Sequence, residues 1–329
     1  MSTQKPPTAA VIGTGTIALG WIALFAARGL RVRVSSTRPD AAEYVTEALP
    51  GYAATLPDGA LDPATLLDRI SFVADLRDAV ADADLVQENA PEDLALKQKL
   101  FARVADAAPP GALLLSSTST LLPDQLGAEL AEPGRVVVGH PFNPPHIVPL
   151  VEVVGARGAD PALVARAVDF YRGLGKHPVV LRRALPGFVA NRLQTALLRE
   201  AIHLVREGVV TVGELDTVVT SSIGQRWAVV GPFEAFHLGG GPGGLRHWFA
   251  HLGAGLERGW ESLGRPPADE ETVETILAQA DLSFARRPYP ELAARRDRRQ
   301  NAVIAALRTE DPAAPAPDSA RTSPAVSQA

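Results

Sequence analysis

Apolar and polar positions alternate along the first half of the chain in a pattern that predicts strands and helices in turn. Short apolar runs between polar or Gly/Pro-containing segments predict strands. They cover residues 8–12, 30–35, 71–73, 84–86, 113–115, 135–139, 150–154 and 178–181. Between most of them apolar residues recur at helical spacing, notably over 17–28, 92–108 and 161–173. This order predicts an α/β fold built on a doubly wound parallel sheet over residues 1–185.

The pattern changes after Pro186 and Gly187. From there the apolar residues recur only at helical spacing, beginning with a long amphipathic helix over 188–207 that Gly208 would end. We therefore predict an all-α C-terminal domain over residues 186–310. Residues 311–329 are rich in Pro, Ala and Ser and lack large apolar side chains, so we predict a disordered tail there.

Composition narrows the class of protein. The chain has 329 residues, of which 46% are hydrophobic and 21% charged, with a net charge of −5. This balance offers no basic surface for nucleic acid, and no apolar run approaches the length of a membrane span. There is no cysteine, which excludes disulfides and thiolate chemistry. The polar start at residues 1–7 lacks the apolar segment of a signal peptide, so we expect a cytoplasmic protein without nucleic-acid or membrane partners.

A glycine-rich turn follows the first predicted strand and opens the first predicted helix. In it, Gly13 permits a tight turn, and Gly15 lets a pyrophosphate approach the helix N-terminus, where Thr16 and Ile17 begin the helix. Ala18 is small enough for close packing of the helix against the strand. In this strand–turn–helix setting the motif predicts a Rossmann-type dinucleotide-binding domain. The alternative is a glycine-rich turn that binds nothing.

The end of the second predicted strand bears on the choice of coenzyme. NAD-binding units usually carry Asp or Glu near this position to hold the ribose hydroxyls, whereas here Ser36 and Arg38 occupy it. A hydroxyl and a guanidinium suit a 2′-phosphate, which favours NADP(H). If Arg38 is only a solvated charge before Pro39, NAD(H) is the alternative.

One imidazole and one carboxylate lie on neighbouring apolar strands. His140 ends the strand that begins at Arg135, and Glu152 lies inside the strand over 150–154. An imidazole takes or gives a proton near neutral pH, and a carboxylate on the next strand would orient it. The simpler interpretation is a turn between buried strands with a satisfied histidine.

Three further side chains have weaker signals. His247 and His251 have the spacing of two metal ligands on one helix face, but no third ligand is evident, so we predict no metal. Arg226, beside Trp227, is a candidate for pairing with a substrate carboxylate. An exposed arginine beside a packed tryptophan explains the same pattern.

Several motifs together resemble the 3-hydroxyacyl-CoA dehydrogenase superfamily over nearly the whole chain, apart from the tail. They lie at residues 13–18, 87–92, 116–119, 139–144, 149–154, 186–192 and 231–233. The chain is more similar to the carnitine and gulonate dehydrogenase branch than to the acyl-CoA enzymes, because Pro141 and Phe142 stand where the latter have two aromatic residues after the catalytic histidine. It is also similar to the ketoreductases of this superfamily in aromatic polyketide pathways.

The resemblance implies roles for individual residues. His140 would be the general acid/base, Glu152 its orienting carboxylate, and Ser119 and Asn191 the groups that hold the reacting oxygen of the substrate. Glu92 and Lys97 would line the nicotinamide side of the coenzyme, and Asn143 would be another coenzyme contact. For Lys97, a solvated helix lysine is the alternative. The helical domain would provide a substrate lid and the interface of a homodimer.

These inferences predict an oxidoreductase that interconverts a β-hydroxyl and a β-keto group on a carboxylic acid or thioester. The hint of NADP(H) favours a ketoreductase in a biosynthetic pathway such as polyketide or antibiotic biosynthesis. A catabolic carnitine or gulonate-type 3-dehydrogenase is the alternative. A crystallin-like structural protein or a coenzyme-bound sensor is the alternative of a different class, and the intact set of catalytic residues argues against it.

Overall fold

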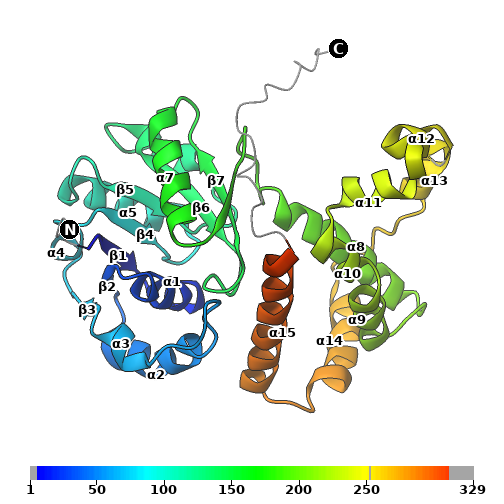
Figure 1. The fold of residues 1–329 in the computed structure, drawn as a ribbon, viewed down its shortest axis with the longest axis horizontal. Helices are drawn as coiled ribbons and strands as arrows, with labels where there is room; N and C mark the ends of the chain where they lie inside the picture. The colour runs from blue at the N-terminus through cyan, green and yellow to red at the C-terminus, as the bar shows by residue number, and fades with distance from the viewer. Residues whose placement is uncertain (1–5, 252, 311–329) are drawn as a thin grey trace.

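The computed structural model describes residues 6–251 and 253–310 of the chain. It consists of a sheet domain and a helical domain, which Figure 1 shows side by side. The tail predicted at residues 311–329 lies outside the described residues.

One eight-stranded sheet forms the centre of the first domain, in the order β3-β2-β1-β4-β5-β6-β7-β8. The strands are β1 (Thr8–Ile12), β2 (Arg31–Ser35), β3 (Ile70–Phe72), β4 (Leu85–Glu88), β5 (Leu113–Ser116), β6 (Val136–Pro141), β7 (Leu150–Gly155) and β8 (His177–Val180). The order reverses direction at β1 and β4, as in a doubly wound sheet. The prediction of a Rossmann-type sheet is confirmed.

One pair of strands departs from the predicted parallel arrangement. β6 and β7 run antiparallel, while the other neighbouring pairs are parallel. The cause is the connection, because residues 142–149 are too few for a crossover, which takes about a dozen residues or more. The antiparallel pairing has a direct consequence for the site, since it places His140 opposite Glu152.

Helices cover both faces of the sheet. The sheet domain contains α1 (Thr16–Ala27), α2 (Ala41–Ala53), α3 (Pro63–Leu67), α4 (Leu76–Val80), α5 (Leu94–Ala107), α6 (Pro123–Leu126) and α7 (Pro161–Gly173). Alternate residues of β1 point to opposite faces, so Ala9 and Val11 join a core with α1, α2 and α7, while Ala10 and Ile12 join one with α4, α5 and α6. The sheet is therefore buried on both sides, and the carboxyl ends of its parallel strands are held rigidly.

The second domain is helical, as predicted. It contains α8 (Ala190–Arg206), α9 (Val212–Ser221), α10 (Ile223–Val229), α11 (Pro232–Gly239), α12 (Gly244–His251), α13 (Leu256–Glu261), α14 (Glu270–Phe284) and α15 (Tyr289–Glu310). The first helix begins two residues later than predicted. Phe188 has a left-handed φ of 47° and a fully buried side chain, so it anchors the linker in the sheet domain before α8 starts.

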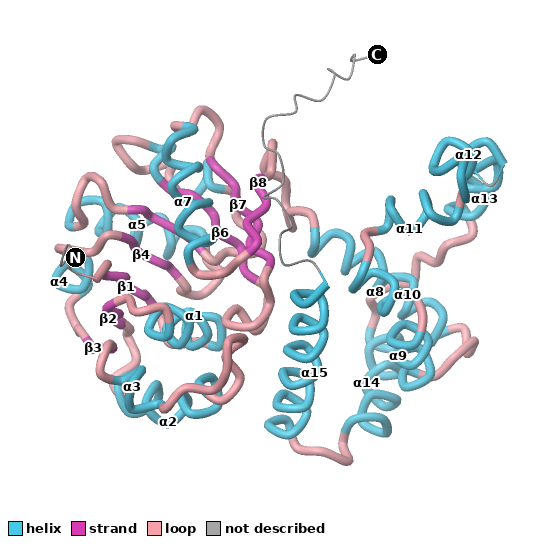
Figure 2. The backbone as a smooth tube through the Cα atoms, in the orientation of Figure 1, coloured by secondary structure: helices cyan, strands magenta, loops and turns pink. Residues whose placement is uncertain are grey.

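The last described helix, α15, returns to the sheet domain. In Figures 1 and 2 it stands between the sheet domain and the other C-terminal helices. The amide of Asn301 donates to the carbonyl of Thr55 at 2.8 Å, and Arg308 pairs with Asp58 at 2.9 Å. The chain thus connects its two domains twice, through the linker before α8 and through α15.

Candidate active site

His140 and Glu152 form a buried hydrogen-bonded pair at the carboxyl end of β6. The side chains are 5% and 2% exposed, and Nδ1 of His140 lies 2.9 Å from Oε2 of Glu152. Burial acts to raise the pKa of Glu152, but hydrogen bonds from His140 and from two backbone N–H groups outweigh it and hold that pKa below its usual value. An ionised carboxylate only accepts hydrogen bonds, so Nδ1 carries the proton and Nε2 is the nitrogen left to exchange a proton with a ligand.

The other oxygen of Glu152 holds the start of α8. Oε1 accepts hydrogen bonds from the backbone N–H groups of Val189 and Ala190, each at 3.0 Å. These N–H groups are among those that a helix N-terminus leaves without an internal partner. One carboxylate therefore fixes both the imidazole of His140 and the helix turn that carries Asn191.

His140 opens into a cavity of about 400 Å³ that brings several predicted residues together. The residues that line it are Ile17, Ser117, Ser119, His140, Pro141, Phe142, Asn143, Asn191 and Gln194. The rings of Phe142 and Phe188 lie 4.6 and 5.4 Å from the imidazole, measured between centroids. The cavity thus combines polar side chains with an aromatic wall at Phe142, which is typical of a small-molecule site.

Glu92 shapes the loop that carries Ser119. Its Oε1 accepts hydrogen bonds from the backbone N–H groups of Ser119 and Thr120, both at 3.0 Å, and from the hydroxyls of Thr118 and Thr120. Burial alone would raise the pKa of Glu92, but these bonds and nearby Lys97 lower it. Glu92 therefore fixes the backbone of the loop that carries Ser119.

Lys97 has a more buried environment than the sequence indicates. It is 1% exposed, and its Nζ donates to Oε1 of Glu88 at 2.6 Å and to the carbonyl of Ala90 at 3.0 Å. The alternative of a solvated helix lysine is wrong. Glu88, which the sequence analysis did not single out, is its main partner and also accepts from Ser116 at 2.5 Å. A charged residue at the end of an otherwise apolar strand was the available signal for it.

The glycine-rich turn has the shape that a dinucleotide needs. Gly13 has a φ of +102°, and a Cβ there would come within 2.8 Å of the carbonyl of Asn89, so only glycine fits. Beside Gly15 the space is open, with no atom within 4 Å of an ideal Cβ. Thr16 and Ile17 begin α1, and Ala18 is fully buried against the sheet. Together with the N-terminus of α1, these features fit a bound pyrophosphate.

Arg38 is not a free cation beside the turn. Its guanidinium pairs with Asp40 at 2.7 Å and lies over the ring of Tyr44 at 3.9 Å. The hydrogen bond from Arg38 lowers the pKa of the Asp40 carboxyl, despite an opposing effect of desolvation. The Ser36 hydroxyl accepts from the backbone N–H of Arg38 at 3.1 Å. Because Asp40 compensates the charge of Arg38, this arginine by itself does not favour a 2′-phosphate.

Other predicted residues lie elsewhere. Arg226 is an exposed residue of α10 and does not line the cavity of His140. His247 and His251 stack their rings at 4.0 Å on α12, and within residues 6–251 and 253–310 no group of three potential ligands gathers around a metal position. No helix in the described part of the chain is both long and apolar enough to cross a membrane.

Two polar residues that line the cavity, Ser117 and Gln194, were not predicted as site residues. Ser117 accepts hydrogen bonds from Trp21 and Gln87 and donates to Asn89, so its hydroxyl is fully engaged at the cavity wall. Gln194 lies one helical turn after Asn191, and this i, i+3 spacing was the signal that would have found it.

Comparison with known families identifies the class of protein. Residues 8–184 match the NAD-binding domain of 3-hydroxyacyl-CoA dehydrogenase, and residues 187–274 match the C-terminal domain of the same family. The chain belongs to the 3-hydroxyacyl-CoA dehydrogenase family. It is accordingly an NAD-dependent dehydrogenase that acts on CH–OH groups.

Individual relatives indicate which branch of the family the chain resembles. An L-carnitine dehydrogenase of Streptomyces griseus subsp. griseus is 43% identical and covers 88% of this chain and 86% of its own length. One of Pseudomonas aeruginosa is 40% identical, over 92% of this chain and 94% of the relative. Among solved structures, an NAD⁺-dependent 5-formyl-3-hydroxy-2-methylpyridine 4-carboxylic acid 5-dehydrogenase superposes with a TM-score of 0.77 at 30% identity, covering 92% and 99% of the two chains. The chain is thus similar to the carnitine dehydrogenase branch that its motifs indicate.

Proposed function

We propose that this chain is an NAD-dependent 3-dehydrogenase of L-carnitine, interconverting the 3-hydroxyl and the 3-keto group. The observation that carries the proposal is the joining of His140, Ser119 and Asn191 around one small cavity, in a chain about 40% identical to L-carnitine dehydrogenases. The names of the relatives also share a chemical feature, because carnitine and the pyridine carboxylic acid are free acids rather than thioesters. A free β-hydroxy acid is therefore the proposed substrate class.

Side chains of this chain can transfer the proton of the substrate hydroxyl. In oxidation Nε2 of His140 takes the hydroxyl proton, while Glu152 stabilises the imidazolium through Nδ1. The hydroxyl of Ser119 and the amide of Asn191 hold the oxygen that becomes the carbonyl. In reduction the same groups act in reverse, and His140 returns the proton. The rings of Phe142 and Phe188, which pack against the imidazole, restrict water around the histidine.

The nicotinamide coenzyme, when bound, accepts or supplies the hydride. Residues of the turn at 13–18 would hold its pyrophosphate, and the cavity wall at Asn143 and Ile17 would border its nicotinamide. We propose NAD(H) as the working coenzyme, because the Arg38 charge is already paired with Asp40. With that, the main support for a biosynthetic ketoreductase is gone, and the relatives favour the catabolic alternative.

We further propose that the protein works as a homodimer. Apolar side chains of α8 and α14 are exposed, including Leu198 at 55% and Leu277 at 50%. Both line an apolar groove of about 330 Å³ between the two helices. A single soluble chain rarely exposes apolar surface on this scale, and a second copy of the helical domain is the proposed cover.

A turnover assay with the full chain tests the function. With L-carnitine and NAD⁺ we expect NADH to form, with a kcat/KM well above that for NADP⁺. γ-Butyrobetaine, which lacks the 3-hydroxyl, is the matched control and should give no turnover. Absence of turnover with L-carnitine, together with turnover of another β-hydroxy acid, would replace the proposed substrate but keep the dehydrogenase. Absence of turnover with every acid would favour the structural or sensor interpretation.

A further inference from the structure

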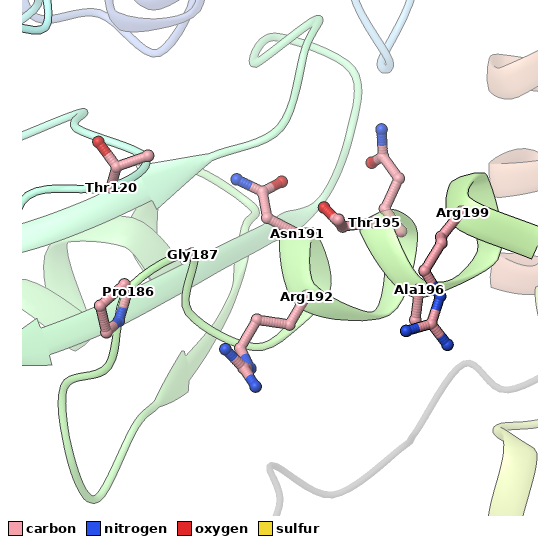
Figure 3. Close-up of a pocket in the computed structure, with 9 residues that line it drawn as sticks. Thr120, Pro186, Gly187, Asn191, Arg192, Thr195, Ala196 and Arg199 are labelled. Atoms are coloured by element: carbon pink, nitrogen blue, oxygen red, sulfur yellow. The ribbon is translucent and has the colours of Figure 1, made fainter. Parts of the chain in front are cut away.

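Two of the elements that border the cavity of His140 lie far apart in the sequence. One is α8, where Asn191 follows the linker from the sheet domain, as Figure 3 shows. The other is the loop of residues 142–149 between β6 and β7, which contributes Phe142 and Asn143. The position of this loop decides how the ring of Phe142 and the amide of Asn143 meet the histidine.

The loop has few hydrogen-bond donors of its own. Three of its residues are prolines, which carry no backbone N–H. The N–H groups of Ile147 and Val148 both donate to the carbonyl of Pro144, at 3.0 Å. Residues 144–147 are nevertheless buried, so other carbonyl groups of the loop need donors from elsewhere in the chain.

Lys176 supplies two of these bonds. Its Nζ donates to the carbonyl of Pro145 and, at 2.8 Å, to that of Val148. The side chain is 5% exposed. The strand register places it there, because β8 pairs with β7 in parallel and His177 lies opposite Leu150, where the loop ends. A residue far along the chain thus bonds to the middle of the loop.

The donors of Lys176, rather than its charge, explain why a lysine occupies this position. No carboxylate among the described residues pairs with it. Burial, with a smaller contribution from the charge of Arg28, lowers the pKa of Lys176 to about 7. A neutral amine still has two N–H groups, so both carbonyls keep a donor in either protonation state. An apolar side chain would also pack near Trp21, whose ring centroid lies 5.6 Å from Nζ, but it would leave both carbonyls unpaired.

The same loop packs directly on α1. At Gly20 of that helix a Cβ would come within 2.5 Å of the ring of Pro145, so the helix backbone and the loop are in contact. The buried imidazole of His146 lies beside it and bonds to the hydroxyl of Thr55 at 2.9 Å. The loop is therefore packed on α1 and bonded to Lys176, within a few residues of Phe142.

We propose that Lys176 is a positioning residue of the active site. By bonding to the carbonyls of Pro145 and Val148, it keeps the ring of Phe142 against His140 and Asn143 at the cavity wall. It touches neither substrate nor coenzyme and acts through the loop. The proposal rests on the proposed function only for the choice of L-carnitine as the substrate of the assay.

The first test removes the donors and keeps the packing. Lys176→Met has a side chain of similar length without N–H groups, and Lys99→Met makes the same change at an exposed lysine of α5. With L-carnitine and NAD⁺ we expect kcat of Lys176→Met to fall about ten- to a hundredfold, because two buried carbonyls lose their donor and the loop shifts. The affinity for NADH should change far less, because the turn at residues 13–18 is intact. Lys99→Met should match the wild type in both.

A histidine resonance reports on the loop without any substrate. The ring of Phe142 lies 4.6 Å from that of His140, so its ring current shifts the imidazole signal. In protein labelled with ¹³C-histidine, the signal of His140 is the one that His140→Ala lacks. We expect this signal to move in Lys176→Met, whereas the signals of His247 and His251 on α12 should stay in place.

Chemical rescue separates the donors from the shape of the side chain. The chain has no cysteine, so Lys176→Cys carries a single thiol. Alkylation of the denatured chain with 2-bromoethylamine restores an amine at the length of lysine, and alkylation with 1-iodopropane restores the length alone. After refolding, beside wild type taken through the same steps, the aminoethyl adduct should regain the wild-type His140 signal and most of the activity. The propyl adduct should resemble Lys176→Met.

Three results would overturn the proposal. They are an unchanged kcat and His140 signal in Lys176→Met, equal recovery by the two adducts, and a propyl adduct that does not fold at all, which would make the lysine a requirement of the fold rather than of the loop. If the wild type does not oxidise L-carnitine, the proposed function fails alone, because the His140 signal still tests the loop.

Discussion

The two domains bury their apolar side chains to very different extents. The sheet domain packs both faces of its sheet into two extended cores of fully buried residues. In the helical domain, Val205 is the one large apolar side chain that is buried among the described residues after Phe188. Phe233, Leu282 and Leu198 are 75%, 80% and 55% exposed there. The sheet domain has a core of its own, whereas the helical domain exposes apolar faces that a second copy of the chain would bury.

This difference matters because the site draws on both domains. His140 and Glu152 lie on β6 and β7 and Ser119 lies in the loop after β5, whereas Asn191 comes from α8. Glu152 is the link between them, since it bonds to His140 and to the first N–H groups of α8. We therefore expect substitutions of His140 and Glu152 to change the chemistry, and substitutions on the exposed apolar faces of the helical domain to change assembly.

The largest effect should follow His140→Ala. Loss of a general acid/base typically lowers kcat by about 10²–10⁴-fold. The affinity for NADH, measured by fluorescence titration, should barely change, because the turn at residues 13–18 is intact. His177→Ala, an exposed histidine of β8, is the control and should behave like the wild type. Near-normal turnover of His140→Ala would show that the sheet domain does not hold the proton-transfer group.

The next largest effect should be on dimer assembly, and only substitutions in the helical domain should cause it. Leu198→Glu with Leu277→Glu places charges in the apolar groove, and a symmetric dimer experiences each change twice. At about 1.5–3 kcal/mol for each buried leucine, the dissociation constant of the dimer should rise roughly a hundredfold or more. Sedimentation analysis measures this. Leu96→Glu, at 44% exposure in the sheet domain, should leave assembly unchanged. A wild type that sediments as a monomer at micromolar concentration would remove the dimer.

Glu152→Gln tests the link between the domains. A glutamine has one acceptor oxygen where the carboxylate has two, so it cannot accept hydrogen bonds from His140 and from the start of α8 at the same time. We therefore expect kcat to fall about ten- to a hundredfold. Glu214→Gln, an exposed capping residue of α9, is the control and should retain activity.

The same variant changes the pH dependence of stability. Because the folded pKa of Glu152 is lowered, its ionised form stabilises the fold above the unfolded pKa of about 4.3. That stabilisation is lost as the pH falls through the lower folded pKa. Glu152→Gln should therefore lose less of its melting temperature than the wild type between about pH 5 and pH 3. An equal acid sensitivity of the two proteins would contradict this role of the carboxylate.

The smallest effect concerns the coenzyme. Asp40→Asn should release Arg38 from its ion pair and raise kcat/KM for NADPH relative to NADH, by less than about tenfold because the pair is exposed and screened. Asp269→Asn makes the same change at the N-terminus of α14 and should have no effect on the ratio. If Arg38→Ala in the wild-type background already lowers the use of NADPH, Asp40 does not neutralise Arg38 as we infer.

Much of the sheet domain was predictable because its signals are local. Apolar runs, helical spacing and turn residues report the conformation of neighbouring residues, which is why the strand order along the chain and the turn at Gly13 emerged from the sequence. The motifs around His140 and Asn191 indicated the family for the same reason, since each motif is contiguous. The antiparallel direction of β7 was missed, although the short connection before it was a local signal.

Contacts between distant residues required the tertiary structure. The sequence alone determined which groups are available, namely a glycine-rich turn, the imidazole of His140, the carboxylate of Glu152 and a helical domain whose first helix carries Asn191. Only the folded chain decided that Lys97 is buried against Glu88, that Arg38 is paired with Asp40, and that Arg226 lies outside the cavity of His140. The physical reason is that an ion pair or a cavity depends on strand register and on helix packing summed over the whole molecule, whereas a motif depends on a few adjacent residues.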